Sequence, residues 1–199
     1  MNTWRAAPTL AGRHVTLRPV IRDDRAALLE AFADGLDQVF ATTVPNAATI
    51  EGWYDRIERE TAAGRTMAFA VLDAEGRVSG STRFLRMNEG HRRVEIGGTV
   101  YAKRVQRTGL NTEAKRLLLA HAFEMLGCNC VQLRTDYLNR QSRRAIERLG
   151  ARQDGVLRGH MVMPGHARDT VVYSILVHEW PGVRANLEAL LAGHEEALR

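Results

Sequence analysis

The feature that most constrains the fold is a strand, a glycine-containing loop and a helix that lead into a second strand. Apolar alternation over residues 92–101 predicts the first strand. A helix with apolar residues at helical spacing follows Gly109 and ends at Gly127, and residues 130–135 predict the second strand. A helical crossover of this kind normally joins parallel strands of one sheet. We therefore expect a central sheet with helices packed against it.

The rest of the chain adds mostly antiparallel strands to this sheet. Residues 66–73 and 77–87 predict a hairpin whose second strand precedes the strand at 92–101, so that the three form a meander. Residues 154–163 and 169–180 predict a closing hairpin. The remaining predicted elements are a first strand at 14–19 and helices that begin near Asp23, Thr49, Asn139 and Pro181.

The order of these elements defines the fold class. An antiparallel meander combined with one parallel crossover predicts an α+β (mixed α/β) fold, with one mostly antiparallel central sheet and flanking helices. A chain of 199 residues is ordinary for one domain, and no repeat or linker divides it. We expect a single domain over residues 1–199, with a core from about 11 to 180 and a C-terminal amphipathic helix from about 181 to 197.

Composition narrows the setting of the protein. No apolar run is long enough to span a bilayer, and no signal-peptide core follows Met1, so we expect a cytoplasmic protein with no membrane partner. Cys128 and Cys130 have no second Cys or His cluster near them in the sequence, so neither a metal site nor a disulfide is predicted.

The net charge of +5 comes almost wholly from arginine, because Lys103 and Lys115 are the only lysines. A basic balance favours anionic partners. The arginines are nevertheless spread along the chain instead of gathered in one tract. Nucleic-acid binding is therefore permitted by the charge but not indicated by it.

Glycines occur within the strand at 92–101 and in the loop that follows it. Gly97 and Gly98 in mid-strand indicate either a plain bulge or a close approach of a ligand to the backbone. In the loop, Gly109 is expected to let the chain curl ahead of a helix N-terminus, whose unpaired N–H groups and positive dipole end suit an anion. Lys103, Arg104 and Arg107 add positive charge. Neither a P-loop nor a dinucleotide-binding fingerprint is present.

Taken with its flanks, this pattern resembles the GCN5-related N-acetyltransferase (GNAT) family, in particular its RimJ/RimL-like branch. The family's pyrophosphate loop is written [RQ]-x-x-G-x-[GA], and residues 106–111, "QRTGLN", match it except that Asn111 stands at the last place. "EIGGTVY" resembles the family's cofactor-side strand, "NRQSRRAIERLGA" its N-x-x-S helix, and "AGRHVTLRPV" its first strand. The resemblance covers about residues 11–180.

The resemblance implies a sheet that splays apart at the "EIGGTVY" strand and binds acetyl-CoA there, with no metal. Asn111 tolerates the left-handed or cap geometry that the family's Gly or Ala adopts. The residues that the family pattern assigns to acetyl-CoA are Val100, Gln106, Arg107, Thr108, Gly109, Leu110, Asn111, Thr112, Asn139 and Ser142.

Acetyl transfer to an amine requires a deprotonated amine, a polarised thioester carbonyl and a leaving thiolate. Glu95, on the cofactor-side strand, is the expected base, and its alternative role is an ion pair with Arg92, Arg93 or another arginine. The resemblance further implies that a backbone N–H near Val100 or Tyr101 binds the developing oxyanion.

The leaving group is the second catalytic question. Many GNAT members place a tyrosine general acid where this chain has Ile146, so that residue type is excluded here. Ser142 is expected to bond the sulfur instead, and its alternative role is a helix-capping hydroxyl. Asn139 is expected either to bind the pantetheine or to cap the same helix. Two roles are open for the arginines of this helix, which are to bind the 3′-phosphate of CoA or to lie on a solvated face; they are Arg140, Arg143 and Arg144.

The acceptor remains open between a protein N-terminus and a small-molecule amine. Aromatic residues near the two early helices, Phe40, Trp53 and Tyr54, either shape its pocket or belong to the core. The alternative function is a non-catalytic CoA-binding or RNA/ribosome-associated module with the same fold. The oligomeric state, monomer or homodimer, is also left open.

Overall fold

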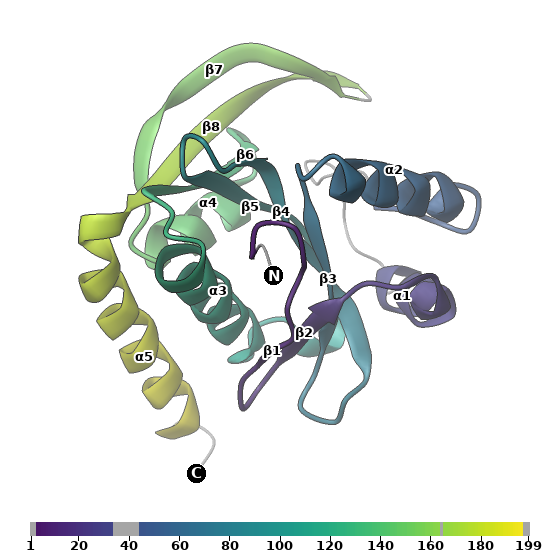
Figure 1. The fold of residues 1–199 in the computed structure, drawn as a ribbon, viewed down its shortest axis with the longest axis horizontal. Helices are drawn as coiled ribbons and strands as arrows, with labels where there is room; N and C mark the ends of the chain where they lie inside the picture. The colour runs from purple at the N-terminus through teal and green to yellow at the C-terminus, as the bar shows by residue number, and fades with distance from the viewer. Residues whose placement is uncertain (1–2, 34–43, 164, 197–199) are drawn as a thin grey trace.

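The computed structural model describes residues 3–33, 44–163 and 165–196 (Figure 1). Its strands are β1 (Leu10–Ala11), β2 (Thr16–Pro19), β3 (Met67–Leu72), β4 (Val78–Asn88), β5 (Arg93–Tyr101), β6 (Cys130–Asp136), β7 (Arg152–Met163) and β8 (His166–Leu176). Its helices are α1 (Arg25–Ala33), α2 (Ile50–Ala62), α3 (Leu110–Ala120), α4 (Arg140–Arg148) and α5 (Trp180–Glu196). The predicted order is confirmed, with the short strand β1 added to it. Phe40 lies outside the described residues.

The strands form one sheet in the order β1-β2-β3-β4-β5-β6-β8-β7. Every neighbouring pair is antiparallel except β5 and β6, which are parallel and joined through α3. The predicted crossover therefore lies in the middle of an otherwise antiparallel sheet. In the part of the chain that the structure describes, no helix is both long and apolar enough to cross a membrane.

β5 and β6 separate partway along their length. Their pairing ends where Ile96 lies opposite Leu133. β5 then continues to Tyr101 paired with β4 alone, whereas β6 continues to Asp136 paired with β8. Among the described residues, no strand pairs with this edge of β5 beyond Ile96, as the expected splayed sheet requires.

The two faces of the sheet are covered by different helices. The Arg83 guanidinium of β4 lies over the Trp53 ring of α2, 5.6 Å from its centroid. The next residue, Phe84, stacks on His121 at the end of α3, with ring centroids 6.0 Å apart. Successive side chains of a strand alternate between faces. Figure 1 shows α1 and α2 on the first side, termed the α2 face, and α3 and α5 on the other, the α3 face.

The core fills the space between the sheet and these helices. The core includes four side chains with 0% of their surface exposed, namely Phe69, Phe84, Leu118 and Tyr173. Burial of one such side chain stabilises a fold by about 1.5–3 kcal/mol. Trp53 packs at the edge of this core and Tyr54 is buried in it, with 2% of its surface exposed.

One boundary prediction was wrong. The strand expected over residues 169–180 ends at Leu176, because Val177–Glu179 form a 3-10 turn. The Glu179 carboxylate accepts the backbone N–H of Leu176 at 2.9 Å and so caps this turn. The final helix consequently begins at Trp180.

Candidate active site

A β-bulge interrupts β5 where it leaves β6. The register with β4 shifts between Ser81 and Arg83, and Gly98 adopts φ 56°. A Cβ on Gly98 would lie 2.6 Å from Nε of Arg83. Glycine is required here both by the left-handed backbone and by the close approach of the guanidinium.

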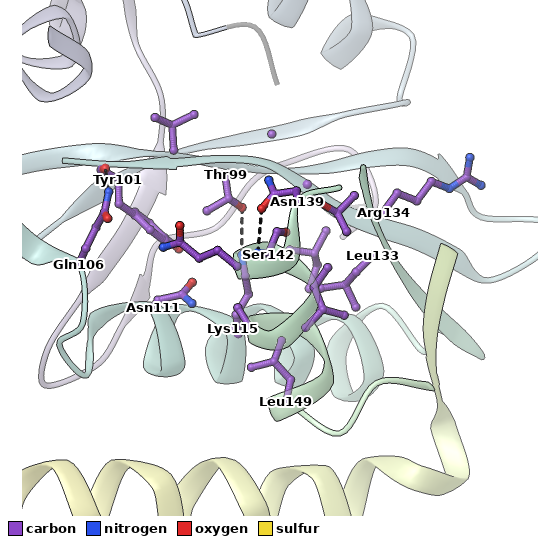
Figure 2. Close-up of a pocket in the computed structure, with 18 of the residues that line it drawn as sticks. Thr99, Tyr101, Gln106, Asn111, Lys115, Leu133, Arg134, Asn139, Ser142 and Leu149 are labelled. Carbon is purple, nitrogen blue, oxygen red and sulfur yellow. Dashed lines mark hydrogen bonds between the residues drawn. The ribbon is translucent and has the colours of Figure 1, made fainter. Parts of the chain in front are cut away.

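A pocket of about 770 Å³ opens beside this bulge, between β5, β6, the start of α3 and α4 (Figure 2). The predicted site residues that line it are Val100, Gln106, Arg107, Asn111, Asn139 and Ser142. Gly97, Gly98 and Thr99 line it as well, so the two glycines serve both a bulge and a ligand-sized opening. The remaining predicted loop residues, Thr108, Gly109, Leu110 and Thr112, are not among its lining.

The loop before α3 takes a different shape from the one expected. Gly109 is the N-cap of α3 with φ −64° and ψ −17°, which any residue tolerates. The left-handed residue is Arg107, with φ 61°. Gly109 is instead constrained by space, because a Cβ there would lie 3.2 Å from the ring of His14. Asn111 sits in the first turn of α3 and needs no left-handed geometry.

This loop and the first turn of α3 carry backbone N–H groups that form no hydrogen bond among the described residues. Within the described residues, the N–H groups of Gly109, Asn111 and Thr112 have no hydrogen-bond acceptor, as is normal in a first helical turn. The Leu110 N–H bonds to the Thr108 hydroxyl at 3.2 Å. Together with the side chains of Lys103 and Arg107, which line the pocket, these groups suit a phosphate.

Glu113 holds this helix N-terminus against the turn between β1 and β2. Its carboxylate accepts the backbone N–H groups of Arg13, His14 and Val15 at 3.0, 2.5 and 3.1 Å. Only 5% of Glu113 is exposed. Sequence reasoning missed this residue, because its partners lie about a hundred positions earlier in the chain.

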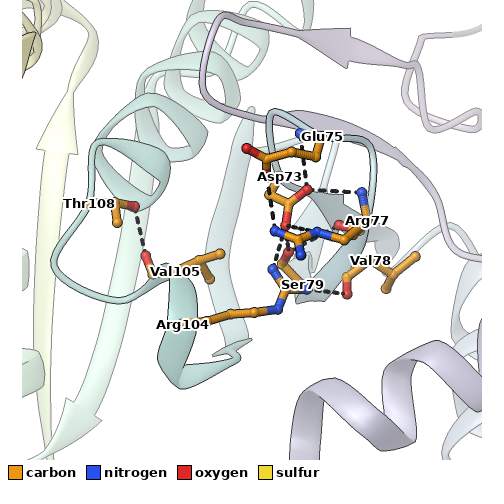
Figure 3. Close-up of polar contacts among 8 residues, drawn as sticks. All are labelled: Asp73, Glu75, Arg77, Val78, Ser79, Arg104, Val105 and Thr108. Atoms are coloured by element: carbon orange, nitrogen blue, oxygen red, sulfur yellow. Dashed lines mark hydrogen bonds and ion pairs between the residues drawn. The ribbon is translucent and has the colours of Figure 1, made fainter.

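Asp73 anchors the start of the same loop through Arg104 (Figure 3). It forms an ion pair with Arg104 and accepts bonds from the backbone N–H of Arg77 at 2.9 Å and the hydroxyl of Ser79 at 3.1 Å. Burial alone would raise the pKa of Asp73, but these bonds lower it overall. The expectation that Arg104 adds charge to the loop was wrong, because its guanidinium turns to Asp73.

On α4, the roles of Asn139 and Ser142 are separated. Asn139 is the N-cap, and its Oδ1 accepts the backbone N–H of Ser142 at 2.9 Å. The Ser142 hydroxyl is therefore not the cap, and its side chain lines the pocket (Figure 2). Ile146, at the place of the tyrosine of other GNAT proteins, is buried and lines the same pocket.

The α4 arginines have different surroundings. Arg143 stacks on the Tyr137 ring, 4.7 Å from its centroid, and its Nε donates to the Tyr173 hydroxyl at 3.1 Å. Arg144 is exposed, whereas Arg140 lines the pocket. Of the three, Arg140 is the one placed to meet a ligand.

Lys115 is a buried amine in this pocket that the sequence did not indicate. Its Nζ donates to the Thr99 hydroxyl at 2.9 Å (Figure 2). The Thr99 hydroxyl shares a further hydrogen bond of 2.8 Å with the Thr82 hydroxyl. Burial lowers the pKa of Lys115 to about 7. Near neutral pH, a fraction of this amine is therefore uncharged.

Known proteins share this architecture. Residues 14–152 match the family described as "Acetyltransferase (GNAT) domain". The chain belongs to the GNAT acetyltransferase family.

Individual GNAT relatives support the assignment. The chain is 34% identical over 113 residues to "Putative ribosomal N-acetyltransferase YdaF" of Bacillus subtilis, a match that covers 57% of this chain and 61% of YdaF. A solved structure of a "putative acetyltransferase" from T. thermophilus superposes with a TM-score of 0.80 at 38% identity, covering 94% of this chain and 98% of that one. The predicted family is confirmed, and the similarity to YdaF accords with the RimJ/RimL-like branch.

The GNAT fold uses acetyl-CoA, and a structural neighbour contains CoA. Mycobacterium smegmatis RimJ, in complex with CoA-disulfide, superposes with a TM-score of 0.80 at 21% identity, covering 96% of this chain and 97% of that one. At 21% identity this likeness concerns the fold, and the family match over residues 14–152 is what identifies the protein as a GNAT acyltransferase. Among the described residues, no group of three or more His, Cys, Asp or Glu side chains is placed to hold a metal ion.

Glu95, the expected base of this GNAT site, lies on β5 with 4% of its surface exposed. Its Oε2 is 2.6 Å from Arg86 and 3.2 Å from Nε of Arg134. The Arg134 contact is an ion pair without the alignment of a hydrogen bond. A Cβ on Gly97, which lines the pocket, would be 3.3 Å from Oε1 of Glu95. The carboxylate therefore forms the anticipated ion pairs and lies beside Gly97, although Glu95 itself is not among the residues that line the pocket.

The histidines of the last hairpin form separate contacts. His166 Nε2 lies 2.8 Å from Oδ2 of Asp136, and His160 Nδ1 lies 3.0 Å from the Thr170 hydroxyl. Asp169 accepts the backbone N–H of Gly159 at 2.7 Å. None of the three is among the residues that line the pocket.

Proposed function

We propose that this GNAT protein transfers the acetyl group of acetyl-CoA to a primary amine by direct attack in a ternary complex. The observation that carries the proposal is the free edge of β5 beside a loop of unpaired backbone N–H groups. An extended pantetheine arm requires such an edge, and a pyrophosphate requires such a loop. Residues 97–101 of β5 line one pocket together with Gln106, Arg107 and Asn111 of the loop.

Cosubstrate binding divides among three groups of residues in this proposal. The N–H groups of Gly109, Asn111 and Thr112 bind the pyrophosphate, with Arg107 adding charge. The backbone of β5 around Val100 pairs with the pantetheine. Arg140, at the pocket wall, is the candidate for the 3′-phosphate.

The chemical step joins the amine nitrogen to the thioester carbonyl carbon and breaks the carbon–sulfur bond. Glu95, acting through water, receives the proton that the amine loses. The backbone N–H near Val100 stabilises the oxyanion, and the Ser142 hydroxyl donates to the departing sulfur. A thiol with a pKa near 8.5 leaves without full protonation, so the absence of a tyrosine at Ile146 does not prevent the reaction.

Thermal-shift measurement with acetyl-CoA, followed by free-thiol detection against peptide N-termini and small amines, tests the proposal. Saturation at a hundredfold excess over the dissociation constant should stabilise the fold by about 2.7 kcal/mol. Stabilisation with amine-dependent thiol release supports it. Stabilisation without release on any amine would favour the non-catalytic CoA-binding module, and no stabilisation would refute both.

A further inference from the structure

The α2 face of the sheet gathers arginines around the bulge and the mouth of the pocket. They come from three different strands and are Arg83 and Arg86 of β4, Arg134 of β6 and Arg168 of β8. Arg134 and Arg168 line the pocket itself, and Arg83 contacts Gly98, which also lines it. Within the described chain, this charge lies where an acceptor would approach the acetyl group of the proposed function.

Among these four arginines, Arg83 has the fewest polar partners within the described residues. Its guanidinium stacks on Trp53 and lies against Gly98. Within the described residues, its Nε is buried without a hydrogen-bond acceptor, and no carboxylate forms an ion pair with it. Burial lowers the pKa of Arg83 to about 10, and repulsion from Arg56 contributes to the shift. A desolvated cation without a counterion is costly in a folded protein, and an anionic ligand relieves that cost.

Arg168 also has few polar partners within the described residues. Its Nε donates to the Thr170 hydroxyl at 3.1 Å, and it forms no ion pair with a carboxylate of the described chain. Burial lowers the pKa of Arg168. Nearby carboxylates oppose this shift, whereas the charges of Arg86 and Arg134 reinforce it. Arg168 is thus a second guanidinium in the pocket wall that retains N–H groups for a ligand.

The carboxylates of this region are already engaged. Glu95 is shared between Arg86 and Arg134. Asp136 faces His166 and also accepts the backbone N–H of Leu138 at 2.9 Å. The guanidinium groups therefore outnumber the carboxylates that face them, and the net charge at the mouth is positive.

We propose that the acceptor of this GNAT protein is a primary amine that carries a carboxylate close to the nitrogen, bound through Arg83 and Arg168. Guanidinium groups bind carboxylates through strong charge-assisted bonds. The same positive field disfavours an ammonium ion and lowers the pKa of the acceptor amine, which increases the nucleophilic free base. Polyamines are disfavoured for the same reason. The inference rests on the proposed function and specifies its substrate class.

A panel of matched acceptors tests the preference with acetyl-CoA saturating. Glutamate and aspartate represent free acidic amino acids, and glutamine amide is their counterpart without a carboxylate. Peptides that begin Ser-Asp-Glu represent acidic N-termini, and peptides that begin Ser-Asn-Gln are their counterparts. Spermidine represents a cationic amine. We expect kcat/KM at least tenfold higher for the acidic member of the preferred pair. Comparison of the amino-acid and peptide arms identifies the source of the carboxylate. Equal or higher kcat/KM for spermidine or the neutral members would overturn the acceptor proposal while leaving acetyl transfer intact.

Two variants locate the subsite. Arg83→Met and Arg168→Gln should each raise KM for the acidic acceptor at least tenfold and leave the dissociation constant of acetyl-CoA unchanged. Arg184→Met, which removes the same charge from exposed α5, is the matched control and should change neither value. An equal loss for acidic and neutral acceptors in both variants would contradict the proposal.

A binding measurement keeps the inference testable if no acceptor turns over. Calorimetric titration of the CoA-saturated wild-type protein with N-acetylglutamate and N-acetylputrescine compares an anionic product with one that lacks a carboxylate. We expect binding of N-acetylglutamate alone, weakened tenfold or more by Arg83→Met. Equal binding of both compounds, or of neither, would refute the carboxylate subsite independently of catalysis.

Discussion

Nζ of Lys115 donates to Oγ1 of Thr99 across 2.9 Å at the point where β5 has parted from β6. Thr99 follows the bulge, and Lys115 lies one turn into α3. This single bond connects the two walls of the pocket by way of an amine with 7% of its surface exposed.

Lys115→Met should stabilise the ligand-free protein near neutral pH. The folded-state pKa of about 7 is far below the ordinary value of 10.5, so the unfolded chain binds the proton more readily between these two values. The wild-type free energy of unfolding should therefore rise as pH increases from about 7 toward 10.5, and the cost should be fully present below pH 7. Chemical denaturation at pH 6.5, 8 and 9.5 should show a gain for the variant of at least about 1 kcal/mol at the lowest pH, diminishing upward. A gain independent of pH would contradict the assignment.

Gly109→Val should raise the acetyl-CoA dissociation constant well over tenfold. The new Cβ would approach the His14 ring to 3.2 Å and shift the N–H groups of the loop. Asn111→Gly should have little effect, because Asn111 is helical and contributes its backbone N–H, which glycine retains. Isothermal titration with acetyl-CoA measures both. Equal effects at the two positions would show that the loop does not bind as proposed.

Glu113→Gln should destabilise the fold by about 2 kcal/mol, because three backbone N–H groups lose a charged acceptor. Denaturant unfolding measures the loss. Glu188→Gln is the control, since Glu188 forms an exposed ion pair with Arg184 and should cost well under 1 kcal/mol. Indistinguishable unfolding free energies in the two variants would mean that Glu113 does not anchor α3.

Glu95→Gln should lower kcat at least tenfold if the carboxylate accepts the amine proton. Arg86→Met is the matched control, since it breaks the 2.6 Å ion pair but keeps the carboxylate. A structural role alone would give both variants the same loss of stability and similar kcat. Unchanged kcat in Glu95→Gln would exclude it as the base and leave the enzyme assignment standing.

The sequence predicted the features that depend on local pattern. The element order and the single parallel crossover follow from periodicity and glycine placement. The family motif supplied the predicted positions that line the pocket, which are Val100, Gln106, Arg107, Asn111, Asn139 and Ser142. These signals are short-range, since strands, loops and first helical turns are set largely by neighbouring residues.

The contacts that the sequence did not predict join distant segments. Glu113 reaches residues 13–15, Arg104 turns to Asp73, and Arg83 packs between Trp53 and Gly98. Each depends on strand register and on the alternation of faces, which a single sequence leaves undetermined. Gly109 illustrates the difference, because its place in the loop was predictable but the His14 ring that restricts it was not.

Amine-dependent formation of an N-acetylated product distinguishes acetyl transfer from CoA binding without catalysis. Purified protein, acetyl-CoA and the amine panel would be incubated, with the acetylated amine quantified by mass spectrometry beside the released CoA. We expect one acetylated amine per CoA released, no release without amine, and a raised KM for acetyl-CoA in Gly109→Val. CoA release that is independent of amine, or acetyl-CoA binding without any acetylated product, would contradict it.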